Sequence, residues 1–163
     1  MFDRSRRRLF MRRRTPDLPR MPWVISEAEF SERCSRCNRC VEACETQIIA
    51  KGDGGFPAVD FGRGECTFCY RCAESCPEHL FRPQTEAAWP IVAKIGEGCL
   101  AHQKIECRSC GDMCEVMAIR FRLQPGGVAL PELDSSSCTG CGACVSVCPV
   151  SAITMVFEEQ EEE

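Results

Sequence analysis

Short apolar segments interrupted by turn residues run along the chain and predict small strands. The clearest is Ile119–Leu123, in which apolar and basic residues alternate strictly, as in a strand with one face in water. Turns rich in glycine and proline are predicted at Gly52–Gly55 and Pro125–Gly127. The other predicted strands are Phe56–Phe61, a strand that begins at Leu80, Ile91–Ile95, Val128–Leu133 and Ile153–Phe157.

One helix start can be recognised before the first strands. The segment Ser26-Glu27-Ala28-Glu29 has the form of a capping box, in which the serine and glutamate side chains bond backbone N–H groups that the first helical turn leaves free. We therefore expect a short helix that runs from this box through Phe30 to Arg33.

Between these elements lie four runs of cysteines, which together contain 16 of the 163 residues. In the closing run, Cys138–Pro149, the gaps are two, two and three residues, the spacing of bacterial iron–sulfur sites. Two-residue gaps let one tight loop direct three sulfurs at one cube, and we expect the fourth cysteine to enter a helix and point at a different cluster. Pro149 would then lie in the first turn of that helix. Gly140 and Gly142 would let backbone amides approach the cluster sulfurs.

The third run departs from this pattern because seven residues separate Cys99 from Cys107, five more than in the other runs. Closing the longer loop costs little entropy, so we expect a complete four-iron cluster there as well. A labile, incomplete or absent cluster is the alternative. His102, inside the insertion, could replace a ligand, although a solvated loop histidine is the simpler interpretation.

Other uses of so many cysteines fit the sequence less well. Disulfides need an oxidising compartment, and the sequence offers no usable export signal. Structural zinc sites usually bring together two pairs of cysteines that lie a dozen or more residues apart. The chain contains no Ser–His–Asp set and no phosphate-binding loop, and its only imidazoles are His79 and His102. The sequence therefore favours electron transfer or cluster handling over enzymatic catalysis.

Charge is distributed unevenly along the chain. Residues 1–20 contain eight arginines and two aspartates, whereas five of the six residues in 158–163 are glutamate. We expect residues 1–22 to form a mobile basic arm, with docking to a partner as the alternative. Nucleic-acid binding is not favoured, because no basic surface interleaved with aromatic residues follows the arm.

The start of the chain also bears on localisation. Ser5-Arg6-Arg7-Arg8 looks like a twin-arginine export signal, but arginines and prolines occupy the place of its apolar region. We therefore expect the protein to stay in the cytoplasm. No apolar run approaches the roughly 18 residues that a membrane span needs.

The cysteine runs form two similar pairs. The runs of the first pair are separated by 21 residues and those of the second pair by 23. In each pair the first run ends in Cys-Glu and the second in Cys-Pro. This repeated unit resembles the two-cluster bacterial ferredoxin. The resemblance implies an α+β fold of two tandem two-cluster modules, with short helices and small antiparallel strands. We expect the arm at 1–22, the modules at 23–84 and 91–157, a linker at 85–90 and an acidic tail at 158–163.

The same resemblance implies a crossed ligation, in which each cluster takes three cysteines from one run and the last cysteine from the other run of its pair. Four 4Fe-4S clusters would then be bound by four sets of cysteines. Set 1 is Cys34, Cys37, Cys40 and Cys76; set 2 is Cys44, Cys66, Cys69 and Cys72; set 3 is Cys114, Cys138, Cys141 and Cys144; set 4, the irregular one, is Cys99, Cys107, Cys110 and Cys148. Because each cluster would join distant segments, metal assembly and folding would be one event.

Over Ser5–Val156 the chain also resembles the NapF family, the ferredoxin-type accessory proteins of periplasmic nitrate reductase systems. The segments that carry the resemblance are Ser5–Arg7, Glu65–Cys72, the irregular Cys99–Cys107 spacing, Glu115–Ile119 and Cys148–Thr154. It implies a cytoplasmic protein, not itself an enzyme, that acts on the catalytic subunit of the reductase before export by loading or reducing its cluster. Plain electron transfer to a redox partner is the alternative.

Overall fold

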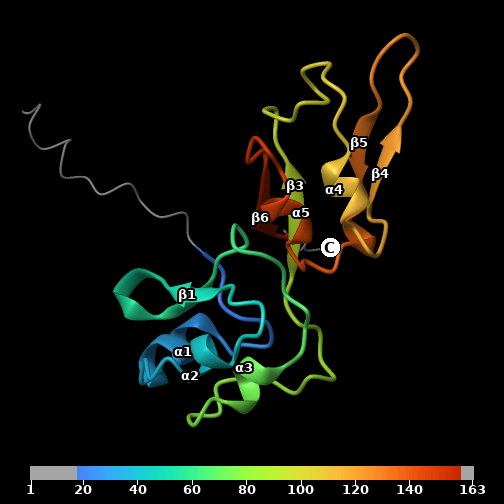
Figure 1. Cartoon of the computed structure of the whole chain (residues 1–163). Helices are drawn as coiled ribbons and strands as arrows, with labels where there is room; N and C mark the ends of the chain where they lie inside the picture. Colours follow the sequence, from blue (N-terminus) through green and yellow to red (C-terminus); the bar gives the residue numbers. More distant parts are fainter. Residues whose placement is uncertain (1–17, 159–163) are drawn as a thin grey trace, which may run out of the picture.

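The computed structural model of the protein describes residues 18–158 (Figure 1). The predicted basic arm up to residue 17, with Arg6 and Arg7, and the acidic tail from residue 159 lie outside the described residues. Residues 18–22, which the sequence assigned to the arm, pack on the first module. Met21 is buried there, and the carbonyl of Pro19 accepts a hydrogen bond from the Val59 amide at 2.8 Å.

Two modules of short elements follow one another along the chain, joined by an irregular segment that leads into β3 (Figure 1). The elements of the first module are α1 (Glu27–Arg33), α2 (Arg39–Ala43), β1 (Ile49–Lys51), η2 (Asp53–Gly55), β2 (Pro57–Val59) and α3 (Arg71–Glu74). Those of the second module are β3 (Ile91–Ile95), α4 (Ser109–Asp112), β4 (Ile119–Arg122), β5 (Leu130–Leu133), η3 (Ser135–Ser137), α5 (Ala143–Ser146) and β6 (Ile153–Phe157). The expected α+β fold of short helices and small antiparallel strands is thus confirmed.

All sheets in the described residues are two-stranded and antiparallel, with β1 pairing β2, β4 pairing β5 and β3 pairing β6. In the second module β3 and β6 bring the ends of the module together, with Ile95 opposite Ile153. The first module has only an isolated bridge at the equivalent place, between Val24 and Phe81. The strand predicted from Leu80 is therefore reduced to one bridge, because Pro83 has no N–H to donate and Trp23 leaves the extended region with φ of 61°.

The helix start predicted at Ser26 is confirmed. Ser26 is the N-cap of α1, and its Oγ lies 3.4 Å from the backbone nitrogen of Glu29 and 3.0 Å from the Glu29 carboxylate. The helix ends at Arg33, as expected, and Phe30 is its buried residue. Cys34, the first cysteine of the chain, therefore lies directly at the end of the helix.

The prediction that Cys148 enters a helix, with Pro149 in its first turn, is wrong. Cys148 and Pro149 lie in the turn that follows α5, and the helix instead contains the third cysteine of the run, Cys144. The reason is the two-residue gap. The residue directly after the second cysteine, Gly142, has a positive φ of 79°, and the short helix begins at the next residue, so that the third cysteine lies inside it. Pro149 cannot prolong that helix, because it lacks the backbone donor.

The hydrophobic core is small and includes cysteines. Its largest fully buried side chains all belong to the first module and are Phe30, Ile48, Leu80 and Val59. Cys72 is part of the first core, and Cys110 and Cys144 are part of the second. No helix within residues 18–158 is long and apolar enough to cross a membrane. The exact division of the chain into arm, modules, linker and tail stays a prediction.

Candidate metal centres

Four small cavities in the structure are each lined by four cysteines, and their membership matches the four sets expected from the repeat. The cavities are lined by Cys34, Cys37, Cys40 and Cys76 (set 1), by Cys44, Cys66, Cys69 and Cys72 (set 2), by Cys114, Cys138, Cys141 and Cys144 (set 3), and by Cys99, Cys107, Cys110 and Cys148 (set 4). All 16 cysteines lie within the described residues and are free thiols. Each cavity is therefore lined by three cysteines of one run and the last cysteine of the other run of its pair, while ligation itself stays a prediction.

The local backbone explains how each loop turns its cysteines inward. In the three regular runs the residue directly after the second cysteine adopts a left-handed conformation, with φ of 63° at Asn38, 66° at Tyr70 and 79° at Gly142. Each of these residues is the N-cap of a short helix, so the chain reverses direction and the third sulfur faces the same cavity as the first two.

Set 4 keeps its geometry despite the longer insertion. The extra residues fold into a compact turn, in which the Gln103 amide donates to the Cys99 carbonyl at 3.2 Å and the Ile105 amide to the Leu100 carbonyl at 2.9 Å. Ala101 is buried under this turn. His102 is exposed and does not line the cavity, so the fourth position belongs to Cys148 from the closing run.

The cysteines surround cavities rather than a single point. Within residues 18–158, no three Cys, His, Asp or Glu side chains converge closely enough to hold one metal ion. Around a single zinc ion each sulfur stands about 2.3 Å from the metal. In a 4Fe-4S cluster each sulfur instead binds its own iron at a separate corner of the cube, which is the arrangement that a four-cysteine cavity offers.

Burial keeps several of these thiols protonated in the absence of metal. It raises the pKa of Cys40, Cys66 and Cys110 to about 11, and the pKa of Cys72 and Cys144 to about 12. A thiolate in such a place needs a cation beside it, and iron supplies that charge when it binds.

Cys44 is the exception, and hydrogen bonds are the cause. Burial raises the pKa of its thiol, but the Thr46 hydroxyl and the backbone N–H groups of Ile48, Ile49 and Thr46 outweigh it, so the pKa is lowered overall. Cys148, the last cysteine of the second module, also accepts a hydrogen bond, from the Ala152 amide at 3.2 Å. N–H groups that donate to a ligand sulfur tune the reduction potential of an iron–sulfur cluster.

All-thiol donors, largely apolar walls and N–H groups aimed at sulfur together fit 4Fe-4S clusters. The cysteines of each set would hold one cluster, and the chemistry that the cluster supplies when bound is one-electron transfer. The chain's own residues orient the sulfurs and bury one cysteine in each of sets 2, 3 and 4, namely Cys72, Cys144 and Cys110.

A contact between the modules was not anticipated from the sequence. The Cys66 amide, in set 2, donates to the carbonyl of Cys141, in set 3, at 2.8 Å. The indole N–H of Trp89 donates to the Thr139 carbonyl at 3.4 Å, and the Trp89 ring packs edge-on to Phe61 with their centroids 5.7 Å apart. Trp89 lies inside the predicted linker at 85–90, but no sequence pattern indicates what it contacts.

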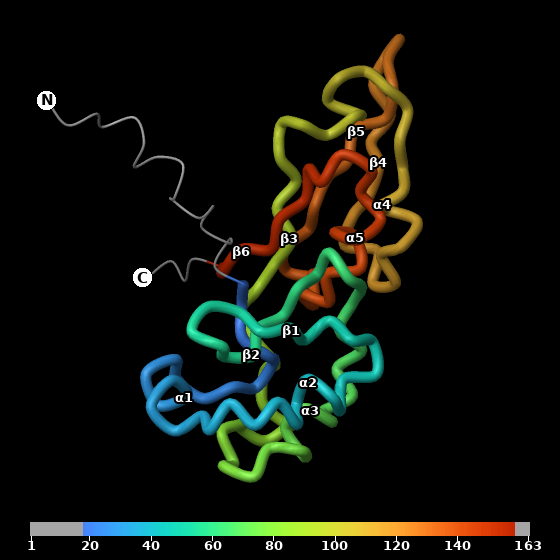
Figure 2. Tube along the Cα trace, turned by 60° about the vertical axis from the view of Figure 1, so that its left-hand side comes forward, coloured from blue at the N-terminus to red at the C-terminus, as the bar shows by residue number. Residues whose placement is uncertain are grey.

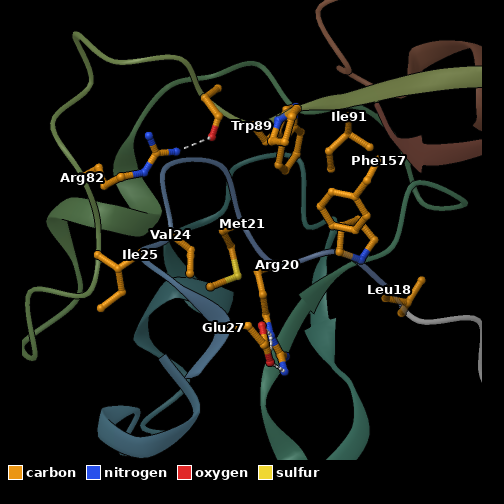
Figure 3. A pocket seen from close by; sticks show the side chains of 13 residues that line it. Leu18, Arg20, Met21, Val24, Ile25, Glu27, Arg82, Trp89, Ile91 and Phe157 are labelled. Carbon is orange, nitrogen blue, oxygen red and sulfur yellow. Dashed lines mark hydrogen bonds and ion pairs between the residues drawn. The ribbon is translucent and has the colours of Figure 1, made fainter. Parts of the chain in front are cut away.

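A cavity of about 500 Å³, larger than the four that the cysteines line, lies away from the cysteines (Figure 3). It is formed by the segment from Leu18, by the linker around Trp89 and by Phe157 at the end of β6. The Arg20 guanidinium contacts the Glu27 carboxylate at 2.6 Å beside it. None of the 16 cysteines lines this cavity, so it is not a cluster site.

Comparisons with known proteins agree with this arrangement of cysteines. Residues 33–80 and 105–160 each match the 4Fe-4S dicluster domain. The chain is 48% identical over 138 residues to the ferredoxin-type protein NapF of Escherichia coli (strain K12), which covers 85% of this chain and 84% of that protein. It is 49% identical over 143 residues to the Haemophilus influenzae protein of the same name, which covers 88% of this chain and 81% of that protein. It is 31% identical over 158 residues to the methylamine utilization ferredoxin-type protein MauM of Methylophilus methylotrophus, which covers 85% of this chain and 69% of that protein.

Proposed function

This chain belongs to the NapF family of ferredoxin-type iron–sulfur proteins, and we propose that it loads or reduces the iron–sulfur cluster of the catalytic subunit of periplasmic nitrate reductase before that subunit is exported. The protein would act in the cytoplasm, without catalysing a reaction of its own and without binding nucleic acid. The partner is the one that the family resemblance implies.

The observation that carries this proposal is the convergence of 16 cysteines on four cavities, four in each. We propose that sets 1 to 4 each bind one 4Fe-4S cluster, with the crossed ligation described above. Set 4 is the candidate donor site, because its first ligand is carried on a separate turn rather than on the tight loop of the other sets.

The surface around the second module supports contact with a partner there. Every large apolar side chain that is markedly exposed in the described residues lies in this module. These side chains are Ile105, Met113, Val116, Met117, Leu123, Val150 and Phe157. Val150 also lines the set 4 cavity, and Ile105 precedes Cys107 by two residues. Exposed apolar groups near a donor site favour docking of another protein at that site.

Electron transfer to a redox partner is the second candidate, and the order of the cavities favours it. Burial is the main cause of the raised pKa of Cys72, Cys66 and Cys144, and a charge on a cysteine of the neighbouring set adds to it in each case. These neighbours are Cys40, Cys141 and Cys110 respectively. Cysteines of sets 1 and 2, of sets 2 and 3 and of sets 3 and 4 are therefore close enough to interact electrostatically.

An anaerobic transfer assay tests the maturation role. The protein would be reconstituted with labelled iron and sulfide and mixed with the catalytic subunit in its cluster-free form. We expect labelled iron to move into the subunit, and a variant with Cys107→Ser to transfer less. If the protein keeps all of its iron, and the subunit matures at its normal rate without it, the maturation role is wrong. Reversible reduction with turnover of a partner would then favour electron transfer.

A further inference from the structure

The two modules touch through the loops that carry cysteine sets 2 and 3. In Figure 2 the segment after β2 rises beside the loop that precedes α5, and the hydrogen bond from Cys66 to Cys141 joins the two. Cys66 is the first cysteine of its run and Cys141 the second of its own. A ligand of one module is thus hydrogen-bonded, backbone to backbone, to a ligand of the other.

Gly142 makes this approach possible. A Cβ at this position would overlap the ring of Phe61, which belongs to the first module. Backbone conformation alone does not require glycine here, since Asn38 and Tyr70 adopt nearly the same φ at the equivalent positions of the first two runs. Glycine at position 142 is therefore explained by the close contact with Phe61 and not by the turn.

Glycine at position 140 is likewise explained by a close contact and not by its backbone conformation. Its φ is 76°, and the equivalent residues of the first two runs, Arg36 and Phe68, have φ of 55° with full side chains. A Cβ on Gly140 would lie 2.5 Å from the Ile91 carbonyl oxygen and 2.6 Å from the indole nitrogen of Trp89. Gly142 therefore faces the first module, and Gly140 faces the linker residue Trp89 and the start of β3.

Trp89 completes the junction. Its ring packs edge-on to Phe61, with the centroids 5.7 Å apart, and to Phe68, with the centroids 6.0 Å apart. Its indole N–H donates a hydrogen bond to the Thr139 carbonyl. Phe68 lies between Cys66 and Cys69 and lines the set 2 cavity. One side chain thus contacts the loop of set 3 and the wall of set 2.

We propose that Gly142 and Trp89 are positioning residues that lock set 2 against set 3, so that the two inner clusters are coupled across the module junction. The contact between Cys66 and Cys141 then links two ligand loops that would otherwise move with separate modules. This inference rests on the proposed occupation of sets 2 and 3, and iron counting tests that occupation separately.

The test uses the reconstituted full chain with Gly142→Ala, and with Gly126→Ala as the matched control. Gly126 also has a positive φ, of 68°, but no atom lies within 4 Å of a Cβ placed there. After chemical reduction, electron paramagnetic resonance reports the magnetic interaction between clusters. We expect Gly142→Ala to lose the interaction that crosses the junction, giving a spectrum like that of two independent modules, and Gly126→Ala to keep it.

A rescue experiment separates the contact from general damage. Adding Phe61→Ala to Gly142→Ala makes room for the new methyl group, and the interaction should return at least in part. If Gly142→Ala does not load iron, Trp89→Phe replaces it, because it keeps an aromatic ring but removes the hydrogen bond to Thr139 and part of the ring contact with Phe61 and Phe68. In that variant we expect about tenfold faster hydrogen exchange in the peptide that contains Cys66, as one backbone hydrogen bond opens more often.

Iron and sulfide counts distinguish the two ways in which the test can fail. Fewer clusters than four in the unaltered chain would overturn the proposed occupation. A full count together with an unchanged spectrum in Gly142→Ala, or unchanged exchange in Trp89→Phe, would overturn the coupling.

Discussion

Glu45 and Arg71 join the two cysteine runs of the first module through an ion pair, with 3.1 Å between Glu45 Oε2 and Arg71 Nη1. The other carboxylate oxygen accepts a hydrogen bond from the Thr67 hydroxyl at 3.1 Å. Glu45 follows Cys44, whereas Thr67 and Arg71 lie inside the second run. The three side chains therefore tie together two segments that also share set 2.

The first prediction concerns this network. Replacing Glu45 by Gln should lower the free energy of unfolding by about 0.5 to 1 kcal/mol, because the ion pair is exposed and screened by solvent. Glu115 is the matched control, since it follows Cys114 in the same repeat position and has no hydrogen bond or ion pair within residues 18–158. Denaturant unfolding of the anaerobic holoprotein measures both variants. Equal effects at Glu45 and Glu115 would contradict the role of the network.

The second prediction concerns pH. The hydrogen bond from Arg20 is the main cause that lowers the pKa of Glu27. A lowered pKa in the folded state gives stability that is present above the unfolded pKa, about 4.3, and is lost as the pH falls through the folded value. Glu27→Gln should therefore destabilise the protein by about 0.5 kcal/mol. The effect should be the same at pH 6 and pH 8, where Glu27 is ionised in both states, and an effect that grows between these values would argue against this origin.

The third prediction concerns crossed ligation. With Cys76→Ser, the cysteines Cys34, Cys37 and Cys40 should become open to alkylation, while the cysteines of set 2 stay protected by their cluster. Cys44→Ser should expose Cys66, Cys69 and Cys72 instead. Mass spectrometry of alkylated peptides reads the pattern directly. If each substitution exposed the cysteines of its own run, ligation would be uncrossed.

The fourth prediction concerns metal removal. The four largest fully buried side chains all lie in the first module, so the second module has less apolar packing of its own to hold it together. An iron chelator added to the anaerobic holoprotein should therefore unfold the second module first. Hydrogen exchange followed by mass spectrometry should show β4 and β5 losing protection before β1 and β2. Earlier loss in β1 and β2 would show that packing does not set the order.

Much of the local structure could be predicted because it depends on neighbouring residues. Strand β3 and strand β6 have the predicted bounds, Ile91–Ile95 and Ile153–Phe157, and α1 begins at the capping box. The strand predicted over Phe56–Phe61 shortens to β2, and its partner β1 was not predicted, because three residues show no periodicity that a sequence pattern can reveal. The helix of the closing run was also misplaced, since it begins after the left-handed residue Gly142 and not at Pro149.

The sequence by itself determined the cysteine spacing, the repeat of two modules and the α+β class, because each follows from residues close together in the chain. Only the tertiary structure decided how the modules meet. The junction joins Phe61 to Gly142 and Cys66 to Cys141, pairs separated by about 80 and 75 positions in the chain. Contacts of that range depend on the shape of two folded surfaces, and no local pattern of hydrophobic and polar residues specifies which surfaces will fit.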